Sequence, residues 1–216
     1  RLQSKILLST TFFLVLLPAL FYFFVEFGGM PMESRILASF FTAVTPRTAG
    51  FNTVDFSKFS DSGIFLQTLL MLVGAAPGST GGGMKITTMT VLFLTSEAIF
   101  RNNSRTEAFG RTIPGEVIRN ATTIAFMYIC LCVLSGMFIS LHENLPLLTT
   151  SFETASAIAT VGLTLGITPK LSPVSHVMLI SLMYIGRVGG LCLIYAVFPN
   201  ANPNKGRLVA ENVIIG

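Results

Sequence analysis

Two short segments of this chain have the residue types of a backbone site for a dehydrated cation. Each starts with a threonine and has a glycine two positions later. A row of carbonyl oxygens can replace the water around a cation, and it needs backbone angles that glycine adopts most easily. Each glycine could instead only end a helix, but the matched positions favour the carbonyl site. The expected filter residues are Thr48, Ala49, Gly50, Phe51, Thr160, Val161, Gly162 and Leu163.

A third candidate element is the glycine-rich run at residues 74–85. Gly78 and Gly83 have the spacing of a phosphate-binding loop, but Met84 stands where that motif needs lysine, and no strand precedes the run. Nucleotide binding here is therefore disfavoured. Glycine and proline together also break a helix, so the run predicts irregular backbone between two half-helices.

A few isolated polar residues could line an ion path, bind a metal or act in catalysis. Arg187 lies in an apolar stretch, where a charge faces a cavity or a partner unless it snorkels to the surface. Glu153 either bonds backbone N–H groups of the second filter or lies at the surface. The histidines and cysteines have no metal-ligand spacing and form no nucleophile–base pair. We therefore expect no enzyme activity.

Composition places the chain in a membrane. Of its 216 residues 51% are hydrophobic and 11% charged, and the mean hydropathy is +0.72, which a soluble globule cannot accommodate. The net charge of +4 does not point to nucleic acid, because the basic residues do not cluster with aromatic ones. The apolar run at residues 6–25 is too long for a signal peptide and predicts a retained span.

Four stretches have the length of a membrane-spanning helix, which takes about 20 residues. They are residues 6–25, 64–95, 118–141 and 174–198, the second interrupted by the glycine-rich run. Residues 33–52 and 147–164 are too short to span, and each predicts a short helix, 33–45 or 147–157, followed by an expected filter. Such re-entrant backbone is tolerated only beside protein or a water-filled cavity.

A shift of 112 positions reveals an internal repeat. It matches six of the twelve residues at 39–50 with those at 151–162. The fold class is therefore an all-α membrane protein with two tandem helix–pore helix–filter–helix repeats. Eight Lys and Arg residues fall on the side of the termini and four, including Arg47, on the other. This bias predicts a multi-pass protein with cytoplasmic termini.

Three motifs carry a family resemblance. Pro46-Arg-Thr-Ala-Gly-Phe-Asn52, the run at residues 74–85, and Thr160-Val-Gly-Leu-Thr164 with Gly186-Arg-Val-Gly189 resemble the third and fourth repeats of the Trk/Ktr/HKT superfamily of potassium transporters. They are most similar to the Ktr-type membrane subunit. The resemblance implies half of a four-repeat, channel-like potassium pore in a bacterial cell membrane, with the first two repeats preceding Arg1. A dependence on sodium and the preference for potassium stay open.

The resemblance also implies a gate, partners and boundaries. The gate lies below the filter, and its partners are the lipid bilayer, a second copy in a homodimer and a cytosolic nucleotide-binding regulatory ring. Residues 1–100 form the third repeat, 101–118 a cytoplasmic linker, 119–198 the fourth repeat and 199–216 a cytoplasmic tail. The expected gate residues are Gly78, Ser79, Thr80, Gly81, Gly82, Gly83, Lys85 and Arg187. A carrier with alternating access, which also uses broken helices, is the alternative.

Overall fold

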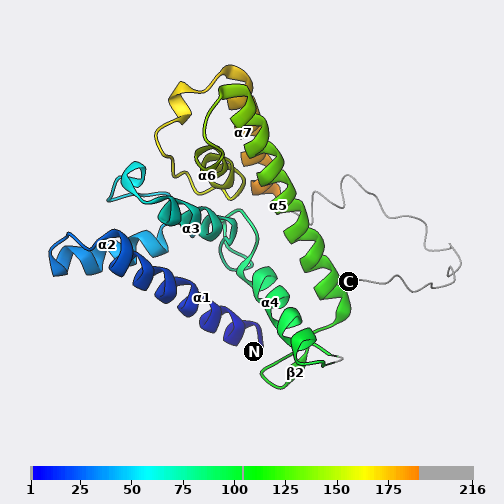
Figure 1. Ribbon diagram of the computed structural model, residues 1–216. Coiled ribbons are helices and arrows are strands. Elements are labelled where there is room, and N and C mark those ends of the chain that lie inside the picture. The colour runs from blue at the N-terminus through cyan, green and yellow to red at the C-terminus, as the bar shows by residue number, and fades with distance from the viewer. Residues whose placement is uncertain (1, 104, 190–216) are drawn as a thin grey trace, which may run out of the picture.

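The computed structural model describes residues 2–103 and 105–189, and this part of the chain is mostly helical (Figure 1). Within these described residues, two helices are long and apolar enough to cross a membrane. The first is α1, Leu2–Phe21, which continues as a π-helical turn over Tyr22–Glu26. The second is α5, Gly115–Glu143. Both lie where the sequence predicts spans.

Helix α1 contains Pro18, which has no backbone N–H. The carbonyl of Leu14, four residues earlier, therefore loses its usual partner within the helix. The helix nevertheless continues past Pro18, and the carbonyl of Leu14 accepts from Arg47 Nη2 at 3.2 Å instead.

Two short helices follow the long ones. Helix α2, Met32–Val44, and helix α6, Leu147–Ile158, each begin directly after a proline, Pro31 or Pro146. Proline suits the start of a helix because the first backbone N–H groups have no partner there. Each short helix ends a few residues before one of the expected filter segments.

The interrupted span consists of two helices with irregular backbone between them. Helix α3 covers Asp61–Leu72. Ser60 caps its start, since the Ser60 hydroxyl accepts from the N–H of Gly63 at 3.1 Å. Helix α4 covers Ile86–Phe100. The residues between α3 and α4 form a loop whose two ends are paired. Val73 and Met84 form a parallel bridge, and Gly74 N donates to Met84 O at 2.7 Å.

The sequence predicted no strands, yet the connection between α4 and α5 contains a small hairpin. Strands β1, Glu107–Ala108, and β2, Arg111–Thr112, pair antiparallel. Phe109 and Gly110 between them both have positive φ, as a two-residue hairpin turn requires. Helix α5 starts after Pro114, at Gly115, so the connection is shorter than the predicted linker 101–118.

Helix α7 is described over Pro173–Val188, with Gly189 following at φ 89°. Ser172 caps its start and Pro173 occupies the first turn. The predicted span reached residue 198, and its last part lies outside the described residues. Arg187 lies in the last turn of the described helix, two residues before Gly189.

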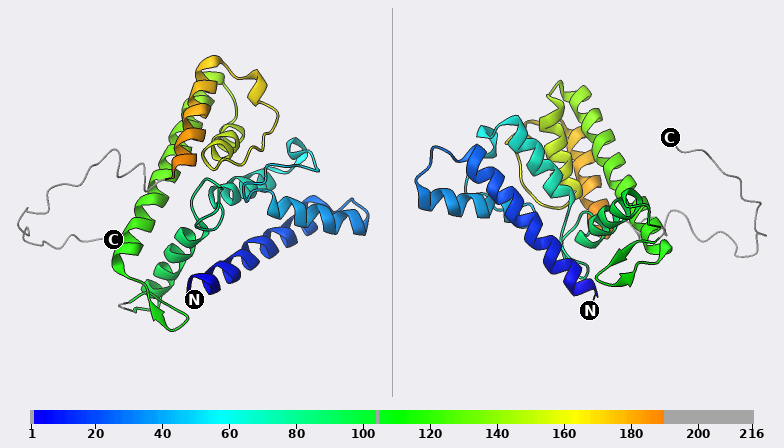
Figure 2. Two further views of the ribbon diagram at one scale, coloured as in Figure 1. Left: turned by 180° about the vertical axis from the view of Figure 1, so that it is seen from behind. Right: turned by 60° about the horizontal axis from the view of Figure 1, so that its bottom comes forward.

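Helix α6 is the centre of the packing, because α3, α5 and α7 all contact it (Figures 1 and 2). All its residues from Phe152 to Ile158 are buried. Helix α1 packs on α2 and α4 at the other side of the molecule. At Gly186, a side chain would overlap the carbonyl of Ile158, so glycine allows α7 to approach the end of α6 closely.

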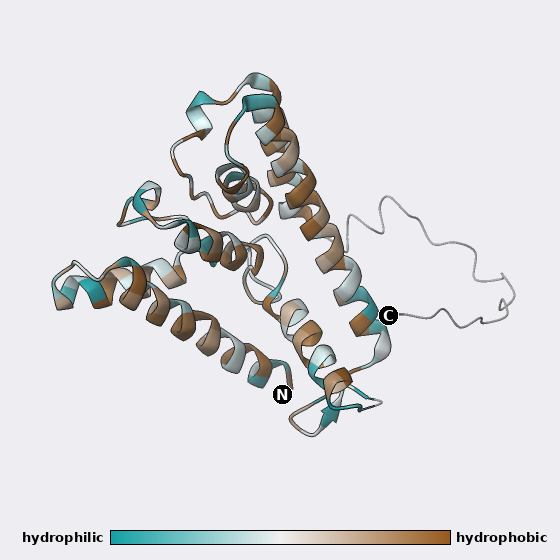
Figure 3. Ribbon diagram, viewed as in Figure 1, coloured by the Kyte–Doolittle hydropathy of each residue, from teal (hydrophilic) through white to brown (hydrophobic). Residues whose placement is uncertain are grey.

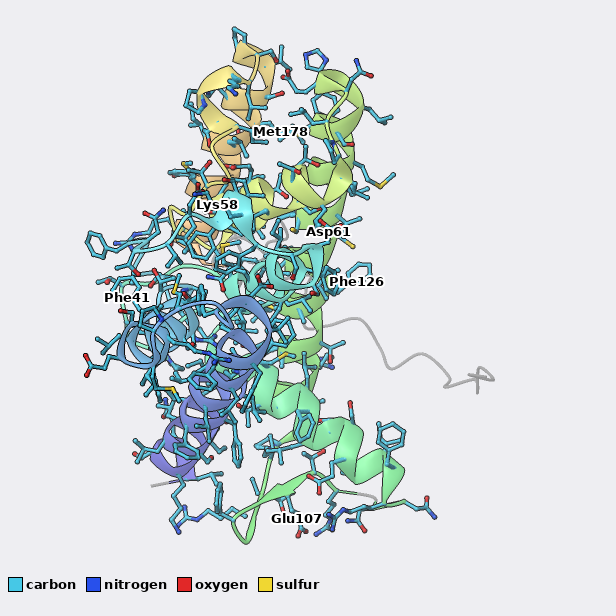
Figure 4. The ribbon with its side chains drawn as sticks, turned by 60° about the vertical axis from the view of Figure 1, so that its left-hand side comes forward. Phe41, Lys58, Asp61, Glu107, Phe126 and Met178 are labelled. Carbon is cyan, nitrogen blue, oxygen red and sulfur yellow. The ribbon has the colours of Figure 1, made fainter. Side chains whose placement is uncertain are left out.

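The long helices consist mostly of hydrophobic residues along their length (Figure 3), and several of these side chains are exposed. Phe12 on α1 is 60% exposed and Phe126 on α5 is 70% exposed, and Figure 4 shows Phe126 at the outer side of the helix. Exposed aromatic side chains at this density are unfavourable in water but favourable in hydrocarbon. The outer faces of α1 and α5 suit lipid.

Candidate functional site

The expected filter segments, residues 48–51 and 160–163, share an unusual backbone. We call them the first and second glycine segments. Thr48 and Gly50 have φ of 66° and 75°, and Thr160 and Gly162 have φ of 54° and 90°. In each case a residue with negative φ lies between the two. An alternation of left-handed and ordinary residues is a backbone that can turn successive carbonyl groups toward one side of a chain, which ordinary extended backbone does not do.

The second glycine segment has one buried side and one open side. The side chains of Val161 and Leu163 are buried in an apolar cluster with Met71 and Phe152. Gly162 between them is exposed, and its Cα has open space beside it. The segment therefore presents backbone, without side chains, on its open side at Gly162.

Each glycine segment is bonded to the end of the short helix before it. The carbonyl of Thr45 accepts from Ala49 N at 3.1 Å and from Gly50 N at 3.4 Å. The hydroxyl of Thr45 donates to the carbonyl of Phe51. In the second segment, Val161 N donates to the carbonyl of Ser156 at 2.9 Å. The helix ends thus hold the strained backbone in place.

Glu153 of α6 is buried and supports the residues that follow the second glycine segment. Its Oε1 accepts from Leu165 N at 2.9 Å and from the Thr164 hydroxyl at 2.6 Å. Its Oε2 accepts from the Thr168 hydroxyl at 2.8 Å. The sequence left open whether Glu153 lies at the surface or bonds the second filter, and in the structure its side chain is buried. Its hydrogen bonds go to residues after 163 rather than to the second glycine segment itself.

The two glycine segments meet although they are far apart in the sequence. A Cβ on Gly50 would overlap the carbonyl oxygen of Val161, so the two backbones are in direct contact there. This approach needs glycine at position 50 for its missing side chain and for its positive φ.

The glycine-rich loop lies against the first residue of both glycine segments. Gly82 N donates to the Thr160 hydroxyl at 3.0 Å. A Cβ on Gly81 would lie 2.6 Å from the hydroxyl oxygen of Thr48. The loop at residues 74–85 therefore touches both threonines, which explains why neighbouring glycines occupy positions 81 and 82.

Two cationic side chains donate to carbonyls of this loop. Lys85 Nζ donates to Gly81 O at 2.5 Å, and the guanidinium of Arg187 donates to Thr80 O. Together they border a cavity of about 350 Å³. The lining residues include every expected gate residue except Gly78, which is exposed with open space around it. The structure thus brings Arg187, distant in sequence, onto the loop, where its charge has a carbonyl partner.

Sequence reasoning missed the contacts of Arg47. Counting Lys and Arg residues predicts Arg47 on the side opposite the termini but predicts none of its partners. The structure places Arg47 half-buried at the end of α2, with Nη1 2.5 Å from Val73 O and Nη2 3.2 Å from Leu14 O. The signal that could have found it is its place directly before Thr48, at the inner end of a re-entrant segment.

Comparisons with known proteins agree on the family. The model of the family TrkH, described as cation transport protein, matches residues 4–204. The potassium/sodium uptake protein NtpJ of Enterococcus hirae is 38% identical over the whole chain and 50% of its own length. The Ktr system potassium uptake protein B of Bacillus subtilis is 35% identical over 90% of this chain and 45% of its own length.

A solved structure shares the fold. The potassium transporter TrkH from Vibrio parahaemolyticus aligns with a TM-score of 0.71, covering 88% of this chain and 44% of that one, at 19% identity. The chain spans about half the length of the curated relatives it matches. Since the family model covers nearly all of the sequence, the chain belongs to the TrkH family of cation transport proteins.

Proposed function

We propose that this chain forms half of a potassium pathway across the membrane, with the two glycine segments as its ion filter. The observation that supports this most is the same pair of left-handed residues, a threonine and a glycine, after each short helix. A pathway for a dehydrated cation needs closely spaced carbonyls on one side of the chain. The relatives named above are potassium or potassium/sodium uptake proteins, and the share of sodium stays open.

Helices α2 and α6 act as pore helices in this proposal. The C-terminal end of a helix carries a partial negative charge, and here it leads directly into a glycine segment. That charge attracts a cation and repels an anion. Two tandem repeats of helix, pore helix, filter and helix result, with the second helix of the first repeat interrupted.

A filter that surrounds an ion needs further segments of the same kind. The relatives are about twice as long as this chain, which leaves room for two more repeats. Phe51 of the first glycine segment is 72% exposed, a surface that such repeats would cover. A homodimer, a cytosolic nucleotide-binding regulatory ring and cytoplasmic termini belong to the same proposal.

The glycine-rich loop is the gate of this pathway. Lys85 and Arg187 occupy the carbonyls of Gly81 and Thr80, which are the groups that a passing cation would use. Their charges also repel it: two unit charges about 4 Å apart interact with about 4 kcal/mol at an effective dielectric constant near 20. Opening requires the loop to leave the cavity. Broken helices also occur in alternating-access carriers, which remain the second candidate.

The proposal is tested by ion selectivity of the full-length parent in proteoliposomes. Gly162→Ser should lower the ratio of potassium to sodium flux, because a side chain would occupy the open side of the second glycine segment and strain its backbone. Gly166→Ser is the matched control, since Gly166 also has a positive φ, 84°, and open space beside it but lies outside the segment. Equal selectivity in both variants would contradict the filter assignment.

A further inference from the structure

Arg47 joins two backbone carbonyls from different helices. Its Nη1 donates to Val73 O and its Nη2 to Leu14 O, at 2.5 and 3.2 Å. Neither partner is a carboxylate, so the arginine does not serve an ion pair in these contacts. Hydrogen bonds from a charged donor are about twice as strong as neutral ones. The guanidinium therefore links α1 to the end of α3.

Both acceptors are carbonyls that helix geometry leaves available. Leu14 O lies four residues before Pro18, which has no N–H to donate to it. Val73 follows the last residue of α3 and is the cap position of that helix, where carbonyls lack partners within the helix. A proline and a helix end thus create the two acceptors that one arginine fills.

The position of Val73 matters because the glycine-rich loop starts there. Val73 pairs with Met84 at the base of the loop, and the loop then reaches Thr160 through Gly82 N. Arg47 itself is followed by Thr48, which contacts Gly81. The same arginine therefore adjoins both the first glycine segment and the base of the loop.

We propose that Arg47 is a positioning residue that anchors the base of the glycine-rich loop to α1 and keeps the loop against the glycine segments. The inference extends the proposed function, in which this loop is the gate. A guanidinium suits the task because its planar fork donates in two directions at once, whereas an ammonium is a compact point charge. Arg47 acts on the loop through Val73, without contact to the permeating ion.

The experiment measures hydrogen–deuterium exchange of the full-length parent in lipid nanodiscs. In Arg47→Gln, the amides of residues 74–86 should exchange about tenfold faster, because the charge-assisted bonds that tie the loop base at Val73 to Leu14 of α1 are lost. Peptides from α5 should be unchanged. The matched control is Arg35→Gln, since Arg35 Nε also donates to a backbone carbonyl, that of Phe23 at 2.7 Å, but does not touch the loop.

Two further variants separate anchoring from general stability. Arg47→Lys should exchange at an intermediate rate, since one ammonium retains part of the contact, and it decides the matter if Arg47→Gln fails to fold. Pro18→Ala supplies an N–H that competes with Arg47 for Leu14 O. This substitution should speed loop exchange when Arg47 is present but add nothing to the effect of Arg47→Gln. Unchanged loop exchange in the Arg47 variants, or faster exchange spread equally over all helices, would overturn the proposal.

The same variants distinguish this inference from the proposed function. Arg47→Gln should raise basal potassium flux without changing the ratio of potassium to sodium flux. If the parent conducts no potassium, the proposed function fails, while the exchange of residues 74–86 still decides the role of Arg47. If flux is present but loop exchange does not respond to Arg47, only the anchoring role is wrong.

Discussion

At the scale of single residues, the site depends on strained threonines. Thr48 and Thr160 are β-branched, and left-handed backbone is a true outlier for such residues. A residue held in such a conformation costs about 1–3 kcal/mol and persists only where its surroundings hold it. For Thr160 those surroundings include Gly82, whose N–H binds the threonine hydroxyl.

Substitution of Glu153 should lower both the stability of the protein and its ion selectivity. In Glu153→Gln, one carboxylate oxygen becomes an NH2 group, which cannot accept the bonds that the carboxylate accepts from Leu165 N and the hydroxyls of Thr164 and Thr168, and the remaining bonds lose their charge assistance. We expect the free energy of unfolding to fall by about 1–3 kcal/mol and the potassium to sodium flux ratio to decrease. Thermal unfolding in detergent and proteoliposome flux measure the two effects. The exposed Glu116→Gln is the control; equal behaviour of both variants would contradict the role.

Arg187 gives a prediction of the opposite sign. Arg187→Gln removes a positive charge beside the loop and its bond to Thr80 O, so the barrier for a cation should fall and the maximal rate of potassium uptake should rise. The selectivity should stay nearly constant, because Arg187 does not contact the glycine segments in any described bond. Ion uptake by cells that lack other potassium uptake systems measures both the maximal rate and the selectivity. Lys170→Gln, an exposed lysine far from the loop, is the control, and lost selectivity would show a structural role instead.

At the scale of elements, the glycine-rich loop connects two half-helices, α3 and α4, that are themselves packed against α6 and α5. Its base is closed by the bridge between Val73 and Met84, and its tip is held by bonds to Thr160 and from Arg187. The small residues at the tip let the loop backbone lie directly against Thr48 and Thr160.

Deleting residues 78–83 should raise basal flux in the absence of any regulatory partner. The deletion removes the carbonyls held by Lys85 and Arg187 and the contacts to both threonines, while Val73 and Met84 remain. Flux of the full-length parent and of the deletion, normalised to the amount of protein in the membrane, checks this. Lower or unchanged flux in a deletion that reaches the membrane would argue against a gate.

At the scale of the whole molecule, the two ends of the helical assembly differ. The start of α1 meets the β1–β2 hairpin through Lys5 Nζ, 5.7 Å from the ring of Phe109. Figure 4 shows Glu107 of this hairpin at the opposite end from Met178 on α7. Helix α5 runs from the hairpin end to the α7 end (Figure 1), so one end should face the cytoplasm and the other the outside.

The topology can be measured with introduced cysteines. Glu107→Cys should react with a membrane-impermeant thiol reagent only after the cells are opened, because the hairpin is expected on the cytoplasmic side. Lys170→Cys, near the start of α7, should react in intact cells. Both positions are exposed, so reactivity reports the side of the membrane. The reverse pattern would contradict the predicted orientation, while leaving the filter assignment untouched.

The sequence by itself determined the family, the helical class, the break in the second span and the paired glycines. These are local properties: apolar length sets a span, and glycine with proline ends a helix whatever its neighbours are. Counting Lys and Arg residues predicts an orientation but no contacts, so the half-buried position of Arg47 and its two carbonyl partners came only from the structure.

Only the tertiary structure decided which groups meet. The bond from Gly82 to Thr160 joins residues 78 positions apart, and that from Arg187 to Thr80 joins residues 107 apart. No local pattern specifies such partners, because a backbone carbonyl looks the same at every position of a sequence. The burial of Glu153 and the double contact of Arg47 likewise arise when helices pack and leave a carbonyl or an N–H without a partner nearby.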